Sequence, residues 1–145
     1  MTISLFSGRY AFLSNFYPSQ IAFEGQFYPT VEHAFQAAKT LDFAERERIS
    51  SLGTPGLAKK AGRKLNLRPG WNDKRIEVMW HLLQLKFEIP FLRNELLNTF
   101  PQELIEGNTW NDTFWGVCDG KGENQLGVML MEVRSHLRFQ MEQSK

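Results

Sequence analysis

The chain has 145 residues, of which 42% are hydrophobic and 23% charged, a composition typical of a soluble globular protein and not of a disordered segment. Lys and Arg number 17 and Asp and Glu 16, so the overall charge favours no class of partner, and the single cysteine, Cys118, excludes an internal disulfide framework or a cysteine-rich zinc site. The first residues carry no secretory signal pattern, and no stretch approaches 18 uninterrupted apolar residues, so we expect a cytoplasmic protein with no membrane partner.

The front of the chain predicts a β-hairpin followed by a helix. Residues 21–23 and 26–28 flank Glu24-Gly25, which is typical of a two-residue hairpin turn. Thr30 can cap a helix over residues 31–40, because its hydroxyl accepts from a free backbone N–H of the first turn.

Capping residues, prolines and apolar spacing predict five further helices, at about 42–52, 54–65, 72–88, 90–98 and 124–139. In the longest helix, the residues expected to face the core are Ile76, Met79, Trp80, Leu83 and Phe87. Short strands are expected at 104–106 and 114–117. Because helices outnumber strands and nothing alternates as β-α-β, the expected class is α+β: one compact, mainly helical domain over residues 1–145 with a small antiparallel sheet.

Three polar residues share one stripe of the helix at 31–40. Glu32, Gln36 and Lys39 fall at i, i+4 and i+7, beside the apolar stripe of the same helix. A carboxylate and an amine separated by one glutamine can serve as acid or base and as cation or nucleophile, but a solvent-exposed helix face has the same spacing. His33 is another candidate, although a histidine at a helix start is more often a hydrogen-bonded structural residue. The three histidines of the chain show no metal-ligand spacing.

Basic residues gather between Lys59 and Arg75, where seven of them accompany one acid, Asp73. The rest of the chain holds 10 basic and 15 acidic residues. This basic cluster on an acidic body suits a phosphate-bearing ligand, and a solvated helix face would explain it equally well.

The segment 106–116 is rich in functional groups, with two carboxylates, two side-chain amides and two tryptophans. Loops held on a rigid scaffold often carry function. A tryptophan offers a flat stacking surface and an aspartate can bond a ribose hydroxyl, whereas a structural Asx-turn with core tryptophans would use the same residues. The residues alone thus indicate an α+β domain with a pocket for a phosphorylated, hydroxyl-rich ligand.

Five ordered groups of residues run nearly from end to end of the chain. They are Phe12-Leu13-Ser14-Asn15-Phe16, Tyr28-Pro29-Thr30-Val31-Glu32-His33-Ala34-Phe35-Gln36-Ala37-Ala38-Lys39, Ala58-Lys59-Lys60-Ala61-Gly62-Arg63, Trp71 with Arg75 and Met79, and Phe114-Trp115-Gly116 followed by Gly120, Gly122, Asn124, Leu126, Gly127 and Leu130-Met131. Together they resemble the YbiA-like family, also called the NADAR (NAD and ADP-ribose) superfamily. The resemblance implies a compact, mainly helical α+β fold.

The resemblance also implies a function. Characterised members of the family cleave N-glycosidic bonds at a ribose anomeric carbon, so an N-glycosidase acting at C1′ of a phosphorylated ribose is expected, with no cofactor and no metal. The implied substrate is either ADP-ribose on a guanine base of nucleic acid, with a functional pairing to an ADP-ribosyltransferase toxin, or a ribosylaminopyrimidine phosphate of riboflavin biosynthesis. The string at 107–111 is more similar to the general NADAR type than to the riboflavin-linked type. A non-catalytic module that binds NAD or ADP-ribose is the alternative.

The matching positions suggest roles for individual residues. Glu32 is the candidate for acid/base work or oxocarbenium stabilisation, and Asp112 for aligning a ribose hydroxyl or a water. Lys39 could attack C1′ and form a Schiff base with the opened sugar, provided that its neighbours lower its pKa; water is the other candidate nucleophile. The expected substrate-binding residues are Asn15, Gln36, Lys59, Arg63, Trp71, Glu106 and Trp115.

Overall fold

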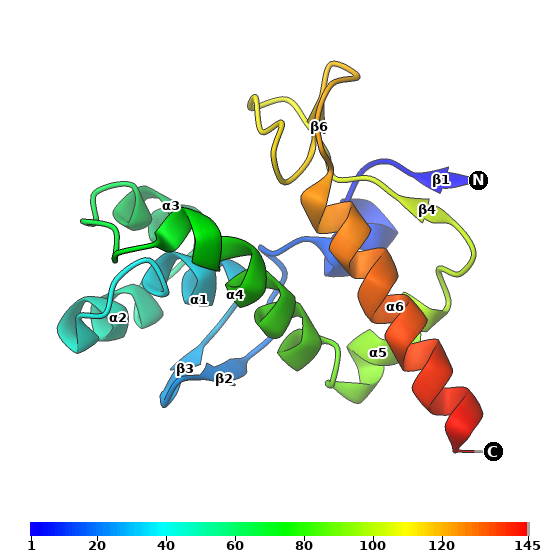
Figure 1. Cartoon of the computed structure of the whole chain (residues 1–145), viewed down its shortest axis with the longest axis horizontal. Coiled ribbons are helices and arrows are strands. Elements are labelled where there is room, and N and C mark those ends of the chain that lie inside the picture. The colour runs from blue at the N-terminus through cyan, green and yellow to red at the C-terminus, as the bar shows by residue number, and fades with distance from the viewer. Residues whose placement is uncertain (145) are drawn as a thin grey trace. The chain divides into compact units, whose positions relative to one another are not determined.

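The computed structural model of the chain describes residues 1–144, which form two compact units. The central unit consists of residues 15–86, and the terminal unit combines residues 1–14 with the chain from Phe87 onward. About half of the described residues are helical, and the strands among them form two-stranded sheets (Figure 1). This confirms the α+β class. None of the described helices is long and apolar enough to cross a membrane.

The hairpin of the central unit forms where the sequence predicts it. Strand β2 (Ile21–Phe23) pairs antiparallel with β3 (Gln26–Tyr28), with Ile21 opposite Tyr28. Glu24 and Gly25 both adopt positive φ, at 48° and 84°, the backbone that a two-residue hairpin turn of type I′ requires. The short turn therefore sets the register of the pair.

Side-chain caps determine where three helices of the central unit begin. Thr30, Asp42 and Thr54 each accept a hydrogen bond from a backbone N–H of the first turn that follows. The helices of this unit are α1 (Val31–Ala37), α2 (Phe43–Ser50), α3 (Pro55–Gly62) and α4 (Trp71–Lys86). The first three are shorter than predicted. At the end of α1, for example, the Lys39 N–H bonds back to the Gln36 carbonyl, a tightened last turn that ends the helix.

Helix α1 lies at the centre of its unit and packs against α2, α3 and α4. Every residue from Val31 to Ala38 is buried, the polar ones included. Glu32 is only 7% exposed and Gln36 only 5%. The interpretation of the polar stripe as a solvent-exposed helix face is therefore wrong, because neighbouring helices cover both sides of α1.

Helix α4 faces the core with a different edge from the one predicted. Met79, Leu83 and Phe87 are buried as expected, but Ile76 is 38% exposed and Trp80 is half-buried. The buried row is completed by Val78, Leu82 and Lys86. Apolar residues occupy much of the helix circumference, so their period does not settle which edge is covered. Packing against β2 and α1 decides it.

The terminal unit contains a 3₁₀ helix, η1 (Gly8–Leu13), which the sequence did not predict, and the helices α5 (Pro90–Leu97) and α6 (Gln125–Gln143). Its strands are β1 (Thr2–Ile3), β4 (Glu103–Leu104), β5 (Gly107–Asn108) and β6 (Val117–Cys118). Here β1 pairs with β4 and β5 pairs with β6, both in parallel. Antiparallel pairing among the described strands is thus confined to the hairpin and one isolated bridge, between Cys118 and Lys121. The β5–β6 pair is parallel because the loop between the two strands returns the chain to the end of the pair at which β5 begins.

Helix α6 packs closely on β4 through Gly127. A Cβ atom at this position would overlap the backbone oxygen of Leu104. Glycine is therefore required by the close approach of the two backbones. Leu126, Leu130 and Val133 are buried as expected.

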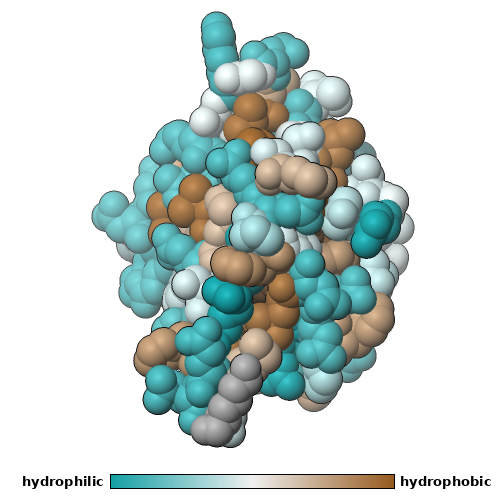
Figure 2. All heavy atoms as spheres, turned by 90° about the vertical axis from the view of Figure 1, so that its right-hand side faces the viewer, coloured by the Kyte–Doolittle hydropathy of each residue, from teal (hydrophilic) through white to brown (hydrophobic). Residues whose placement is uncertain are grey.

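Several large hydrophobic residues of α5 and α6 are exposed, among them Phe91 and Phe139. The side of the molecule drawn in Figure 2 shows hydrophobic side chains scattered among hydrophilic ones. The Arg138 guanidinium lies 3.4 Å from the centroid of the Phe100 ring, a cation–π contact on one face of a ring that stays partly exposed. Scattered exposed hydrophobic residues are normal in folded proteins and by themselves mark no docking surface.

Candidate functional site

The first part of the candidate site is the polar stripe of α1. Gln36 Nε2 donates to Glu32 Oε1 over 3.1 Å, and both side chains are buried. Lys39 lies two residues beyond the last residue of the helix and is half-buried. A carboxylate, an amide and an amine thus share a protected environment, which strengthens the electrostatic interactions between them.

Asn15 adjoins the start of α1. The Glu32 backbone N–H donates to the Asn15 carbonyl oxygen over 3.1 Å, and Asn15 Nδ2 lies 3.6 Å from the Met79 sulfur. The side-chain oxygen of Asn15 is buried and has no hydrogen-bond partner among the described residues. Asn15 is thus held next to the predicted acid/base by its own backbone.

Helix α3 brings cations close to Lys39. Burial lowers the pKa of the Lys39 amine below its ordinary value; the Glu32 carboxylate raises it in part, and the Arg63 and Lys59 cations lower it further. More of the amine is therefore neutral than for a lysine in water, as a nucleophile requires. Glu32, Lys59 and Arg63 thus all act electrostatically on Lys39.

Trp71, the first residue of α4, is buried and packs on Phe35. The two ring centroids are 5.3 Å apart and the planes are inclined by 52°. A core contact thus accounts for this tryptophan, and its role in substrate binding stays a prediction.

His33 is a structural residue of the helix start. Its Nε2 lies 2.9 Å from the Leu52 carbonyl, which can only accept, so Nε2 carries the proton and Nδ1 accepts from the Thr30 hydroxyl over 2.8 Å. Burial lowers the pKa of His33, and the bond to Leu52 raises it in part. Within residues 1–144, no group of three or more His, Cys, Asp or Glu side chains could hold a metal ion.

In the terminal unit, Asn108 organises the loop of predicted site residues. Its Nδ2 donates to Glu106 Oε2 over 3.0 Å and to the Asp112 carbonyl over 2.9 Å, while its Oδ1 accepts from the backbone N–H groups of Trp110 and Asp112. Sequence reasoning missed this residue. The available signal was an amide inside a short segment rich in carboxylates and turns, where asparagine often bonds nearby backbone.

Asp112 closes the next turn of the same loop. Its Oδ1 accepts from the backbone N–H groups of Phe114 and Trp115, over 3.1 and 2.9 Å. This is the Asx-turn that the sequence left open as an alternative. The rings of Phe114 and Trp115 meet edge to face, with centroids 4.8 Å apart.

Gly116, the last residue of the Phe114-Trp115-Gly116 motif, leaves space for the carboxylate of Glu106. A Cβ atom at this position would overlap Glu106 Oε2 and the Glu106 carbonyl oxygen. Glu106 is therefore held between Asn108 and Gly116. The structure brings Glu106, Asp112 and Trp115 together in one loop of the terminal unit, and it gathers Asn15, Glu32, Gln36, Lys39, Lys59 and Arg63 within the central unit.

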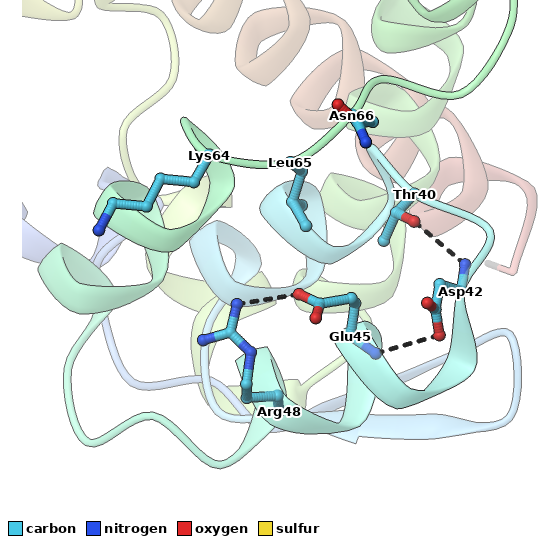
Figure 3. Close-up of a pocket in the computed structure, with 7 residues that line it drawn as sticks. All are labelled: Thr40, Asp42, Glu45, Arg48, Lys64, Leu65 and Asn66. Atoms are coloured by element: carbon cyan, nitrogen blue, oxygen red, sulfur yellow. Dashed lines mark hydrogen bonds and ion pairs between the residues drawn. The ribbon is translucent and has the colours of Figure 1, made fainter.

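A hollow of about 400 Å³ also opens on the central unit (Figure 3). It is lined by Thr40, Asp42, Glu45, Arg48, Lys64, Leu65 and Asn66. Arg48 pairs with Glu45 over 2.9 Å, and the Asp42 carboxylate caps α2 by accepting backbone N–H groups. The residues predicted for the site are not part of its lining, and we do not assign it a function.

Comparison with known proteins defines the class. The NADAR domain family matches residues 5–138. The chain is 41% identical over 138 residues to N-glycosidase YbiA of Escherichia coli (strain K12), covering 92% of this chain and 86% of that protein. It is 34% identical over 135 residues to N-glycosidase Npun_R5314 of Nostoc punctiforme, covering 89% of this chain and 86% of that protein.

Two further comparisons extend this result. The chain is 37% identical over 134 residues to riboflavin biosynthesis protein VVA0006 of Vibrio vulnificus, covering 90% of this chain but 36% of that protein. The NMR structure of E. coli YbiA matches with a TM-score of 0.84 at 38% identity, over 97% of this chain and 89% of that one. The chain therefore belongs to the NADAR domain family and has the YbiA-like fold, as its motifs indicate.

Proposed function

We propose that this protein is an N-glycosidase that releases a base from C1′ of a phosphorylated ribose. The observation that carries the proposal is the buried carboxylate of Glu32 in one environment with Lys39, an amine whose pKa burial lowers. The N-glycosidase relatives, which align over most of the chain, support it.

Glu32 supplies the charge that the reaction needs. Departure of the base gives C1′ oxocarbenium character, which a nearby carboxylate stabilises, and a carboxylic acid can instead protonate the departing nitrogen. Burial strengthens either effect, because little water screens the charge.

Lys39 is the proposed nucleophile. Its neutral amine forms a bond to C1′ while the bond from C1′ to the base nitrogen breaks, and the base leaves with the bonding pair and a proton from the acid. Loss of a proton from the nitrogen of lysine and ring opening, with protonation of the ring oxygen, give a protonated imine. Water then adds to C1′ and displaces the lysine. Direct attack by water is the alternative, with its proton passing to a carboxylate.

Lys59 and Arg63 are the proposed contacts for phosphate. Lys59 lies on α3 and Arg63 directly follows its last residue, one helical turn further on, so one anion can touch both. Asp112 keeps its proposed role in aligning a ribose hydroxyl or a water. Because Oδ1 already accepts two backbone N–H groups, that role falls to Oδ2.

Two substrates are proposed: ADP-ribose on guanine in nucleic acid, which entails pairing with an ADP-ribosyltransferase toxin, and a ribosylaminopyrimidine phosphate. The deciding experiment incubates the protein with each and detects the released base by mass spectrometry. Release from one substrate assigns it. Binding of ADP-ribose with no release from either substrate would favour the non-catalytic binding module.

A further inference from the structure

We propose that Gln36 is a positioning residue that fixes the carboxylate of Glu32. Gly62, which has no side chain, leaves the space that the Gln36 amide needs to make this contact. The inference rests on the proposed role of Glu32 as the ionised carboxylate that stabilises the oxocarbenium character of C1′. It concerns a hydrogen bond within the protein, and Gln36 need not touch the substrate.

The contact itself is local and protected. Gln36 lies four residues after Glu32 on α1, so the two side chains are neighbours on the helix surface. Gln36 Nε2 donates to Glu32 Oε1 over 3.1 Å, and the two side chains are 5% and 7% exposed. This bond also fixes the orientation of the amide, because a carboxylate oxygen requires the nitrogen of the amide beside it.

The other end of the amide is less well satisfied. With Nε2 turned to Glu32, Gln36 Oε1 is buried and has no hydrogen-bond partner among the described residues. A buried carbonyl oxygen without a donor costs stability, whereas an apolar side chain of the same length would not. The glutamine therefore serves something other than packing, and its bond to Glu32 is the interaction that the structure shows.

Gly62, the last residue of α3, lies directly against this oxygen. A Cβ atom at position 62 would overlap Gln36 Oε1 and would lie 2.7 Å from Cδ and 3.0 Å from Cβ of Gln36. Gly62 is buried in an ordinary helical conformation, so the backbone does not require glycine there. The close packing of α3 against the amide does, because a side chain at position 62 would displace the amide that contacts Glu32.

The hydrogen bond has a consequence that packing alone would not produce. A donor to a carboxylate favours its ionised form, so losing the donor moves ionisation to higher pH. Lys39, which interacts electrostatically with Glu32, and the α3 cations Lys59 and Arg63, which act on Lys39, are unchanged in the variants below. A shift in the acid limb of the pH–rate profile therefore reports the missing donor.

The test uses Gln36→Met, which keeps the length of the side chain and removes the amide, and Gly62→Ala, which keeps the amide but displaces it. Gly56→Ala is the matched control, because it lies on the same helix and its added Cβ would meet only Thr54 Oγ1, at 3.9 Å. We expect both test variants to lower kcat at least about tenfold. We also expect their acid limb to move to higher pH with little change in KM, and the control to behave as the wild type.

A double variant checks that the two residues act through one contact. In a Gln36→Ala background no amide remains to be displaced, so adding Gly62→Ala should lower kcat no further. A folded Gln36→Met variant with wild-type kcat and an unmoved acid limb would overturn the positioning role. Wild-type behaviour of Gly62→Ala would overturn the role proposed for Gly62, that its missing side chain keeps the Gln36 amide in place.

A measurement without substrate separates this inference from the proposed function. The Glu32 carboxyl carbon is followed by NMR during a pH titration of the free protein, in the wild type, Gln36→Met and Gly62→Ala. A midpoint that moves to higher pH in both variants supports the contact even if neither substrate is cleaved, and an unmoved midpoint contradicts it even if the wild type is active.

Discussion

The Thr30 hydroxyl oxygen lies 2.8 Å from His33 Nδ1 and accepts the His33 backbone N–H over 3.0 Å. One side chain thus caps α1 and also fixes the ring of the residue that follows Glu32. With Nε2 bonded to the Leu52 carbonyl, the neutral ring joins the start of α1 to the chain after α2.

His33 makes stability depend on pH below neutrality. Burial lowers the pKa of His33 in the folded state, so the unfolded chain binds this proton more readily. The contribution is present above the ordinary histidine pKa of about 6.5 and is lost as the pH falls through it. Urea unfolding from pH 8 to 5 should show a falling free energy of unfolding, with a shallower fall in His33→Asn. Equal slopes in the two proteins would contradict this.

Lys86 makes the free energy of unfolding depend on pH in a second range, above neutrality. It is fully buried in α4, its Nζ lies 6.0 Å from the Tyr17 ring centroid, and burial lowers its pKa to about 7. The unfolded chain keeps this proton up to the ordinary lysine pKa, so stability should rise as the pH increases from about 7 towards 10. Lys86→Met, similar in length and uncharged, should abolish most of this rise in the same unfolding assay. An unchanged rise of the free energy of unfolding in this variant would show that Lys86 does not cause it.

Glu32→Gln should remove acid/base chemistry while keeping the shape of the side chain. We expect kcat to fall at least about 10²-fold, the range of general acid–base contributions, with the circular dichroism spectrum unchanged. Glu47→Gln on the exposed side of α2 is the control and should keep full activity. An active Glu32→Gln enzyme would transfer the acid/base role to Asp112 or Glu106.

The phosphate contacts can be tested by ligand binding. Lys59→Ala and Arg63→Ala should each weaken binding of ADP-ribose roughly tenfold, because each removes a charge-assisted hydrogen bond. Thermal stability should change little. Lys60→Ala, on the same helix and exposed, is the control for general charge. Unchanged affinity in both test variants, measured by calorimetry, would reduce the cluster to a solvated helix face.

Lys39→Arg separates a nucleophile from a cation. Guanidinium stays protonated and cannot attack C1′, so we expect turnover to be almost abolished, whereas a purely electrostatic role would tolerate arginine in part. Borohydride should trap a mass adduct on Lys39 of the wild type during turnover, since it reduces an imine to a stable amine. Substantial turnover of the variant together with no wild-type adduct would leave water as the nucleophile.

Local sequence was enough wherever a structure depends on a few neighbouring residues. The hairpin turn at Glu24-Gly25 and the caps at Thr30, Asp42 and Thr54 form as predicted, because each needs only bonds within about four residues. Ordered motifs also identified the family, and the i, i+4 spacing placed Glu32 and Gln36 on one stripe of α1, whereas Lys39 lies beyond the last residue of that helix.

The burial of that stripe depends on contacts between segments that are distant in the sequence. Whether Glu32 and Gln36 face water or the interior depends on the helices that cover α1, and no spacing within α1 carries that information. The inward edge of α4, the parallel pairing of β1 with β4 and the bonds of Asn108 likewise depend on segments that meet in space. The lowered pKa of Lys39 has the same origin, since burial and the cations of α3 act across the fold. The order of residues along the chain fixes which groups are available, and packing between distant segments fixes which of them are buried and shifted in pKa.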